Sequence, residues 1–145
     1  MAPNEELLGP ILRDVSRVFH LTLRVLPAAV RPQIGLAYLL ARTTDTIVDS
    51  DLVPAEQRLQ TLRQFRARIR DDAAPPVDFS SLANEQKNPA ERTLLLRSAG
   101  ALEMLDQLTP ADRGQVQLVL ETITRGQEMD LERFGDGSTL IALQT

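Results

Sequence analysis

The sequence predicts an all-α protein, and three observations support this fold class. Apolar residues recur at helical steps of three and four in nearly every periodic segment. No segment shows the clear alternation of apolar and polar residues that is typical of a half-buried strand. Two strong helix-start signals, Asn88-Pro89 and Thr109-Pro110-Ala111-Asp112, stand directly before such periodic segments.

The first half of the chain is expected to form three helices. The first helix has an apolar side made of Leu8, Ile11, Val15 and Val18 or Phe19. Leu26-Pro27 then opens a long helix that reaches Asp49, because a first turn tolerates proline, whose missing N–H would have no partner there. After a linker over residues 50–54, Pro54 starts a third helix with the apolar residues Leu59, Leu62, Phe65 and Ile69. This third helix also carries arginines that we expect to face solvent: Arg63, Arg66, Arg68 and Arg70.

The second half is expected to form a loop and two helices. Residues 71–87 contain Pro75-Pro76 and scattered polar residues, which favours a surface loop. Asn88-Pro89 begins a helix with Leu94, Ala101, Leu105 and Leu108 at helical steps. The next helix runs from Pro110 to about Phe134, where residues 135–138, Gly-Asp-Gly-Ser, end it. Its inward side starts apolar and ends polar, which indicates either a cavity mouth or a helix emerging into solvent: Val116, Val119, Ile123, Gly126, Gln127 and Asp130.

The long helix carries the most informative pattern over residues 31–49. A polar stripe with alternating steps of four and three keeps six residues on one face: Arg31, Gly35, Tyr38, Arg42, Asp45 and Asp49. The other faces are largely apolar, the reverse of an ordinary surface helix. Asp45 and Asp49 lie one turn apart and repel each other unless a cation lies between them, and Mg²⁺ prefers such oxygen ligands with substrate phosphates completing its shell. Spacing alone favours the plainer alternative, a solvated face with an Arg42–Asp45 pair.

Composition excludes several function classes. The chain has 145 residues, enough for one domain with a core, and its net charge of −4 leaves no basic excess for binding nucleic acid. It has no cysteine and one histidine, His20, which excludes disulfides and multi-histidine metal sites within the chain. We assign His20 no chemistry. No stretch of about 18 uncharged apolar residues is present to span a membrane, and the N-terminus does not read as a signal peptide, so the expected location is the cytoplasm.

Three blocks of the sequence resemble the squalene/phytoene synthase family, the head-to-head prenyl diphosphate synthases. The first block is Ser16-Arg17-Val18-Phe19 with residues 21–27, and the second is residues 36–49, which end in Asp45-Thr46-Ile47-Val48-Asp49. The third is residues 125–131, which look like the family's later helix before its catalytic tyrosine region. The resemblance covers about residues 10 to 137, and it favours an active-site role for the polar stripe.

The resemblance implies an all-α isoprenoid synthase-type helical bundle around a deep cavity. It implies that two farnesyl diphosphates condense through presqualene diphosphate, and that NADPH then reduces this intermediate to squalene. By residue match, Asp45 and Asp49 would hold Mg²⁺ against a diphosphate and would be catalytic together with Tyr38. Arg17 and Arg42 would contact the diphosphate or the cofactor's phosphate. The match assigns further residues to substrate binding: Ser16, Gln127 and Asp130.

The chemistry of this reaction requires the same residue types. Ionising an allylic diphosphate needs metal ions and arginines where the charge of the departing pyrophosphate develops. The carbocation that remains must be kept from water, which requires apolar walls. A stripe of Asp, Arg and Tyr beside faces of Leu, Ile and Val meets both needs.

The sequence departs from the family pattern in three ways. Val48 stands where eukaryotic-type squalene synthases carry glutamate, and Val18 replaces the serine usual in the first block. A second aspartate-rich motif and the tyrosine-bearing helix are expected after Asp130, and neither is found. The chain also ends within a new apolar segment, residues 139–143. We therefore expect residues 1–145 to be the N-terminal part of a single domain, a fragment that is inactive unless C-terminal helices come from the same or another chain.

Three functions stay open at this point. The first is squalene synthesis from farnesyl diphosphate. The second is the same fold making phytoene from geranylgeranyl diphosphate, or hydroxysqualene from farnesyl diphosphate, because cavity depth sets chain length and methylene groups are discriminated weakly. The third is a non-catalytic helical partner or remnant. Since the substrates are lipids, we also expect loose peripheral association of the full enzyme with a membrane, without an anchor.

Overall fold

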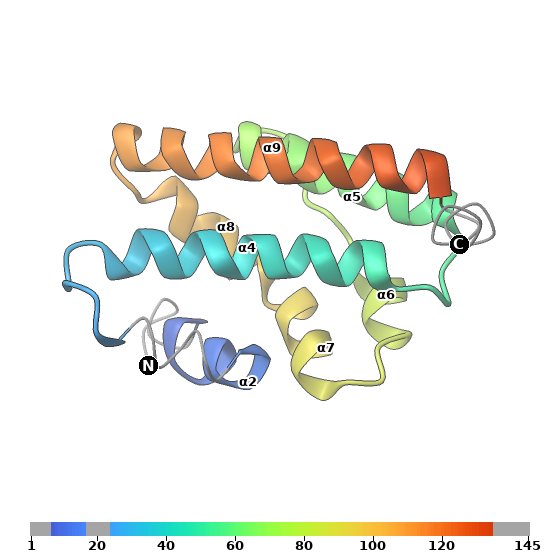
Figure 1. Ribbon diagram of the computed structural model, residues 1–145, viewed down its shortest axis with the longest axis horizontal. Coiled ribbons are helices and arrows are strands. Elements are labelled where there is room, and N and C mark those ends of the chain that lie inside the picture. Colours follow the sequence, from blue (N-terminus) through green and yellow to red (C-terminus); the bar gives the residue numbers. More distant parts are fainter. Residues whose placement is uncertain (1–6, 17–23, 135–145) are drawn as a thin grey trace, which may run out of the picture.

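The computed structural model describes residues 7–16 and 24–134, and this part of the chain is helical without a strand (Figure 1). The all-α prediction is therefore confirmed. In chain order the elements are η1 (Leu7–Ile11, a π-helical turn), α2 (Leu12–Val15), α4 (Arg31–Asp49), α5 (Ala55–Arg70), α6 (Ser80–Asn84), α7 (Pro89–Leu96), α8 (Ser98–Asp106) and α9 (Pro110–Phe134).

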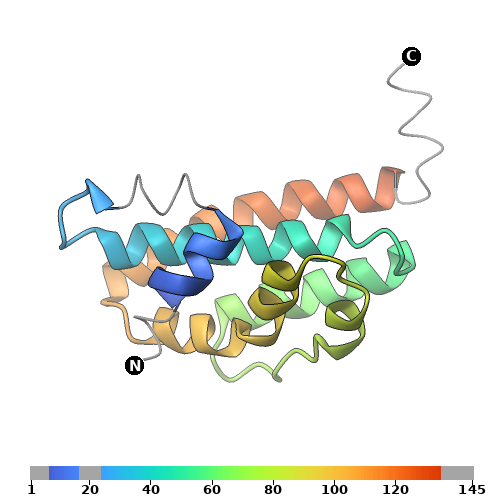
Figure 2. The same cartoon turned by 90° about the horizontal axis from the view of Figure 1, so that it is seen from below.

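Three long helices, α4, α5 and α9, form the frame of the molecule, and each packs against the other two. In Figure 1, α9 runs in the same direction as α4 and opposite to α5. The short helices α2 and α7 lie on the other side of α4 from α9, as Figure 2 also shows from below. Helix α4 is thus enclosed by packing partners along much of its length, and α7, α8 and α9 all contact it.

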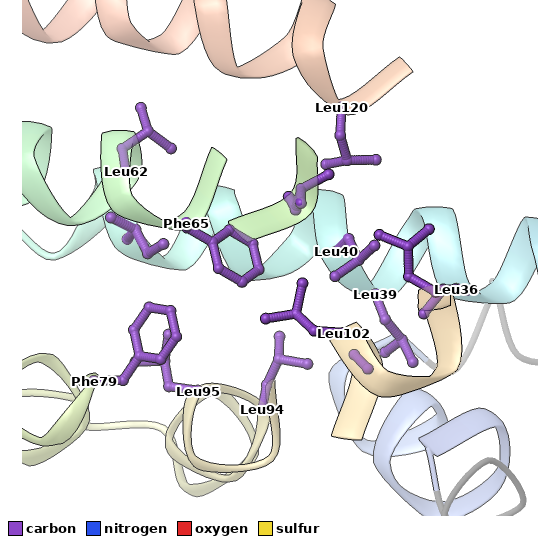
Figure 3. Close-up of a cluster of buried hydrophobic side chains, with 14 of the residues drawn as sticks. Leu36, Leu39, Leu40, Leu62, Phe65, Phe79, Leu94, Leu95, Leu102 and Leu120 are labelled. Atoms are coloured by element: carbon purple, nitrogen blue, oxygen red, sulfur yellow. The ribbon is translucent and has the colours of Figure 1, made fainter. Parts of the chain in front are cut away.

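The core lies between these helices and explains why their sequences are helical and apolar at the observed steps. Leu36, Leu39 and Leu40 of α4 are fully buried, and they face apolar side chains from α5, α7, α8 and α9 (Figure 3). Phe65 of α5 meets Phe79 edge to face, with ring centroids 5.5 Å apart. Each large apolar side chain that is buried in this way contributes roughly 1.5–3 kcal/mol to the free energy of unfolding. This packing fixes the rotation of α4 about its axis.

Two predicted helix starts are confirmed in atomic detail. The Asn88 side chain accepts a hydrogen bond from the backbone N–H of Ala90 at 2.8 Å. The Thr109 hydroxyl accepts one from the N–H of Asp112 at 3.2 Å. Helix α5 begins directly after Pro54, and α9 extends to Phe134 as predicted. Residues 135–145, with the expected stop signal and apolar end, lie outside the described residues, as do Val18 and Phe19.

Helix α4 begins at Arg31, so the prediction that Leu26-Pro27 opens it is wrong. A turn precedes the helix, in which the N–H of Val30 donates to the Pro27 carbonyl at 3.1 Å. The Arg31 side chain closes this turn by donating to the carbonyls of Leu26 at 2.7 Å and Arg24 at 2.8 Å. A different proline therefore occupies the first turn, namely Pro32.

Two further predictions of local structure are wrong. The expected loop over residues 71–87 contains α6, which buries Leu82 and Ala83. The single helix expected after Asn88 is divided into α7 and α8, because Arg97 leaves helical geometry with a ψ of 9°. Helix α7 packs on α2 and α6, whereas α8 packs on α5 and α9. Tertiary packing, rather than a local break signal, thus accounts for the division.

The inward side of α9 also differs from the prediction. It follows steps of four and is made of Val116, Leu120, Thr124 and, two turns on, Leu131. Val119 is 49% exposed, and Gly126 and Asp130 are exposed as well. The cause is that α9 packs into the space between α4 and α5, so that the line facing both helices is buried rather than the line predicted.

The prediction that the arginines of α5 face solvent holds for Arg63 and Arg70, which are exposed, but is wrong for Arg66 and Arg68. The Arg66 and Arg68 side chains are only 16% and 14% exposed. Arg66 pairs with Glu128 of α9, and Arg68 pairs with Asp106 of α8 at 2.9 Å. All four arginines pair with acids of α8 or α9, and the exposed ones, Arg63 and Arg70, do so at the rim of the contact. The spacing of the arginines alone did not reveal these partners.

Across the described ranges, every helix is too short or too polar to cross a lipid bilayer.

Candidate functional site

The polar stripe of α4 is held at the edge of the core by the residues on the opposite side of the helix. Those residues are Leu36, Leu39, Leu40, Thr43 and Ile47, all of them buried. Asp45 is half-buried, and Asp49, at the C-terminal end of the helix, is exposed. The two carboxylates therefore lie one turn apart at the boundary between protein and solvent.

Helix α9 brings a second predicted site residue to this stripe. The side-chain amide of Gln127 donates a hydrogen bond from Nε2 to Asp45 Oδ1 at 2.8 Å. The two residues are 82 positions apart in the sequence. The parallel packing of α4 and α9 accounts for this contact, since it places the C-terminal halves of both helices side by side (Figure 1).

Helix α7 contributes a residue that the sequence analysis missed. Glu91 accepts a hydrogen bond from Arg42 Nη2 on one carboxylate oxygen and from the Thr46 hydroxyl on the other. Glu91 is buried, with only 9% of its surface exposed. The signal available in the sequence was Asn88 followed three residues later by Glu91, which ordinarily predicts a capping box. In the structure Asn88 caps α7, while the Glu91 carboxylate binds α4 instead.

These surroundings raise the pKa of the Asp45 carboxyl above its ordinary value of 3.8. Burial is the main cause, and the nearby charge of Asp49 is the next. Arg42 and the hydrogen bond from Gln127 act in the opposite direction, while Glu91 adds to the rise. The protein thus stabilises the ionised form of Asp45 less well than water does.

The structure also describes three other predicted site residues. Tyr38 is half-buried and packs against the hydrophobic core. Ser16 directly follows the last residue of α2, and its N–H donates to the Leu12 carbonyl at 2.8 Å. Asp130 is exposed on α9, one turn after Gln127. Arg17 lies outside the described residues, as does His20. The structure therefore brings Asp45 and Gln127 together directly, with Arg42 and Asp49 close enough to affect the Asp45 charge.

The donor set at Asp45 and Asp49 consists of carboxylate oxygens. In residues 7–16 and 24–134, no group of three or more histidine, aspartate or glutamate side chains is arranged to hold a metal ion by itself. Two carboxylates do fit the way in which Mg²⁺ is bound beside a phosphate, since this ion takes one or two carboxylates and fills its octahedral shell with water and substrate oxygens.

A comparison with protein families identifies the chain. The model of the squalene/phytoene synthase family matches residues 12–144. The chain therefore belongs to the squalene/phytoene synthase family, as the resemblance of its sequence blocks had indicated.

Individual relatives are distant and much longer. The chain is 33% identical over 78 residues to a squalene synthase of Botryococcus braunii, a match that covers 54% of this chain and 16% of the relative. It is 30% identical over 70 residues to the squalene synthase of Nicotiana benthamiana, which covers 48% and 17%. A bifunctional lycopene cyclase/phytoene synthase of Blakeslea trispora is 25% identical over 127 residues, 85% of this chain and 19% of that protein. The matched segments thus cover less than a fifth of the length of these relatives. No solved structure matches it significantly.

Proposed function

We propose that the protein is a prenyltransferase that condenses two farnesyl diphosphates head to head, through presqualene diphosphate, to squalene. Membership of the squalene/phytoene synthase family supports this reaction class. The observation that carries the proposal is the contact of Gln127 with Asp45, because it joins two separately predicted site segments at one place. This contact lies at the Asp45–Asp49 pair, whose spacing and exposure suit a bound cation.

In this function, Asp45 and Asp49 would hold Mg²⁺ against the substrate diphosphate. The ion would supply positive charge where the departing pyrophosphate becomes more negative. Arg42 contributes a fixed positive charge beside Asp45, and Gln127 orients the Asp45 carboxylate through its 2.8 Å hydrogen bond. Arg17 is proposed as a second diphosphate contact, with Ser16, Tyr38 and Asp130 as further substrate contacts. The carbocation would need apolar walls beside the stripe to keep water from it.

NADPH is proposed as the reductant for the case in which squalene is the product. Reduction of presqualene diphosphate needs a hydride, which no amino-acid side chain supplies, so a nicotinamide cofactor fits the chemistry. Arg17 and Arg42 are the residues proposed to meet its phosphate.

The test is a calorimetric titration of the protein with farnesyl thiodiphosphate, a substrate analogue that resists ionisation. We expect binding in the presence of Mg²⁺ and at least about tenfold weaker binding in its absence, which is a difference of about 1.4 kcal/mol. Inorganic pyrophosphate with Mg²⁺ serves as the comparison that separates recognition of the diphosphate from recognition of the prenyl chain. Equal affinity with and without Mg²⁺ would contradict the metal assignment, and lack of binding in both cases would contradict the substrate class.

Phytoene synthesis from geranylgeranyl diphosphate is the second candidate. The observation that favours it is the relative matched over 85% of this chain, whose name includes phytoene synthase. Product analysis after incubation with each diphosphate separates the candidates. A C30 hydrocarbon that forms only with NADPH supports squalene, and a C40 hydrocarbon that forms without it supports phytoene.

A further inference from the structure

Glu91 is a buried residue that hydrogen-bonds to the helix carrying the candidate site. It comes from α7, yet its two carboxylate oxygens accept hydrogen bonds from Arg42 and Thr46 of α4. Burying a carboxylate is unfavourable unless its oxygens have partners, and here both do. Its position in the first turn of α7 also places its negative charge at the favourable end of the helix dipole.

The two contacts have different consequences for α4. Thr46 fixes the Glu91 carboxylate, because the threonine side chain is short and lies on a buried part of the helix. The carboxylate in turn restrains Arg42, whose side chain is 35% exposed and would otherwise sample many rotamers. Arg42 Nε is also buried, without a hydrogen-bond partner among the described residues. The guanidinium is therefore held by Glu91 at one nitrogen, while part of the group faces solvent.

The position of this held guanidinium makes the restraint relevant to function. Arg42 lies one turn before Asp45 and acts electrostatically on its carboxyl. A planar guanidinium recognises a phosphate through paired N–H groups, so its orientation matters as much as its charge.

We propose that Glu91 is a positioning residue that acts through Arg42: it holds the guanidinium beside Asp45 in the orientation that meets a substrate diphosphate. Thr46 is the anchor that holds Glu91 in place. The functional part of this inference rests on the proposed function, whereas the restraint of Arg42 by Glu91 does not.

The first experiment therefore measures the restraint without any substrate. Nitrogen-15 relaxation of the arginine Nε–H groups is recorded for the parent, for Glu91→Gln and for a control, Asp106→Asn. Asp106 makes a similar partly buried pair with Arg68 at 2.9 Å, away from the α4 stripe. We expect the order parameter of the Arg42 Nε–H to fall from about 0.85 to below about 0.6 in Glu91→Gln and to stay unchanged in Asp106→Asn. The variant Arg42→Lys assigns the signal. A rigid Arg42 in Glu91→Gln would overturn the inference, whatever the protein's substrate.

The second experiment is a double-mutant cycle on turnover with farnesyl diphosphate and Mg²⁺, in a protein that also contains the C-terminal helices. We expect Glu91→Gln to lower kcat about tenfold in the parent but less than about twofold in an Arg42→Lys background, because coupled residues give non-additive effects. A merely structural Glu91 would lower thermal stability and give additive effects on kcat, and that result would overturn the inference. Where Glu91→Gln does not fold, Glu91→Asp replaces it in both experiments, since its shorter side chain cannot hold Arg42 and Thr46 together.

If a protein that also contains the C-terminal helices shows neither turnover nor binding of farnesyl thiodiphosphate, the proposed function fails. The relaxation experiment then still decides whether Glu91 holds Arg42. The two failures are therefore distinguishable.

Discussion

Helix α9 makes two interfaces, and the acidic side chains in them have different hydrogen-bond partners. Towards α5, its glutamates meet arginines. Glu121 accepts hydrogen bonds from Arg70 Nε of α5 and from Arg125 Nε of α9 itself, both at 2.7 Å. Glu128 accepts from Arg63 Nε at 2.9 Å and pairs with Arg66 at 2.5 Å. Positive and negative charges alternate along this contact, so each acid is neutralised by the protein itself.

Towards α4, the acids meet amides. Gln127 of α9 donates to Asp45 of α4 at 2.8 Å, and Gln33 of α4 donates to Asp112 of α9, also at 2.8 Å. An amide satisfies a carboxylate oxygen without cancelling its charge. The same helix pair thus has an amide–carboxylate bond near each end, and one of the two lies at the candidate site.

The pKa values of Glu121 and Asp45 reflect this difference in partners. Hydrogen bonds from Arg70 and Arg125 lower the pKa of Glu121 from 4.5 to about 2. Burial and the neighbouring Asp49 raise the pKa of Asp45. An acid that is held ionised by arginines stabilises the fold, whereas an acid that the fold leaves uncompensated has negative charge available for a ligand cation. The α5 side of α9 is therefore structural, and we assign the α4 side to function.

The strongest test of this contrast is Asp45→Asn. In a protein that also contains the C-terminal helices, we expect turnover with farnesyl diphosphate to fall by about 100-fold or more, because the Mg²⁺ that stabilises the departing pyrophosphate would lose a charged ligand. We also expect the free energy of unfolding without Mg²⁺ to rise at neutral pH. The raised pKa means that folding favours the uncharged side chain, and asparagine is uncharged. Steady-state kinetics and urea unfolding measure the two effects. Near-parent turnover at limiting Mg²⁺ would remove Asp45 from the site.

The converse test on the α5 side is Glu128→Gln. We expect it to lower the free energy of unfolding by about 1.5–3 kcal/mol, since Arg63 and Arg66 lose a charged hydrogen-bond acceptor that is largely buried. Affinity for Mg²⁺ and farnesyl thiodiphosphate should not change. The control is Glu132→Gln, which removes a second partner of Arg63 where both side chains are about half exposed, 49% and 51%, and should cost at most about 1 kcal/mol. Equal losses in the two variants would mean that burial of the pair does not matter.

The two amide contacts allow a matched comparison. Gln127→Leu and Gln33→Leu each remove a 2.8 Å hydrogen bond to an aspartate between the same two helices. Each should lower the free energy of unfolding by about 1 kcal/mol. Only Gln127→Leu is expected to weaken Mg²⁺-dependent binding of farnesyl thiodiphosphate, by about fivefold, because only Asp45 loses its orientation. Equal binding by both variants would argue against a role for Gln127 in the site.

The smallest expected effect is a change in acid stability at Glu121. Because its pKa is lower in the folded protein, its contribution to the free energy of unfolding is complete above pH 4.5 and is lost as the pH falls towards about 2. Glu121→Gln should therefore lower stability at pH 7 and flatten the pH dependence within this window. Urea unfolding of the parent and of Glu121→Gln at several pH values measures this pH dependence. Parallel pH profiles for parent and variant would show that Arg70 and Arg125 do not perturb the acid.

Much of the site could be predicted from the sequence, because helical periodicity is local. The spacing of Arg42, Asp45 and Asp49 places them on one face of α4 whatever surrounds the helix. The third sequence block also selected Gln127, which the structure brings to Asp45. Glu91 could not be selected in this way, since its position in the first turn of α7 is equally explained by helix capping.

The sequence by itself determined the all-α class, the starts of α5, α7 and α9, and the polar stripe of α4, because each depends on neighbours within one or two turns. Only the tertiary structure decided which side of α9 is buried, where α7 ends and α8 begins, and that the arginines of α5 bind α9 and α8. It also decided that Asp45 meets an amide while Glu121 meets arginines. These features depend on residues some 40 to 80 positions apart, and local periodicity carries no information about which of the possible partners the packing of the helices will bring into contact.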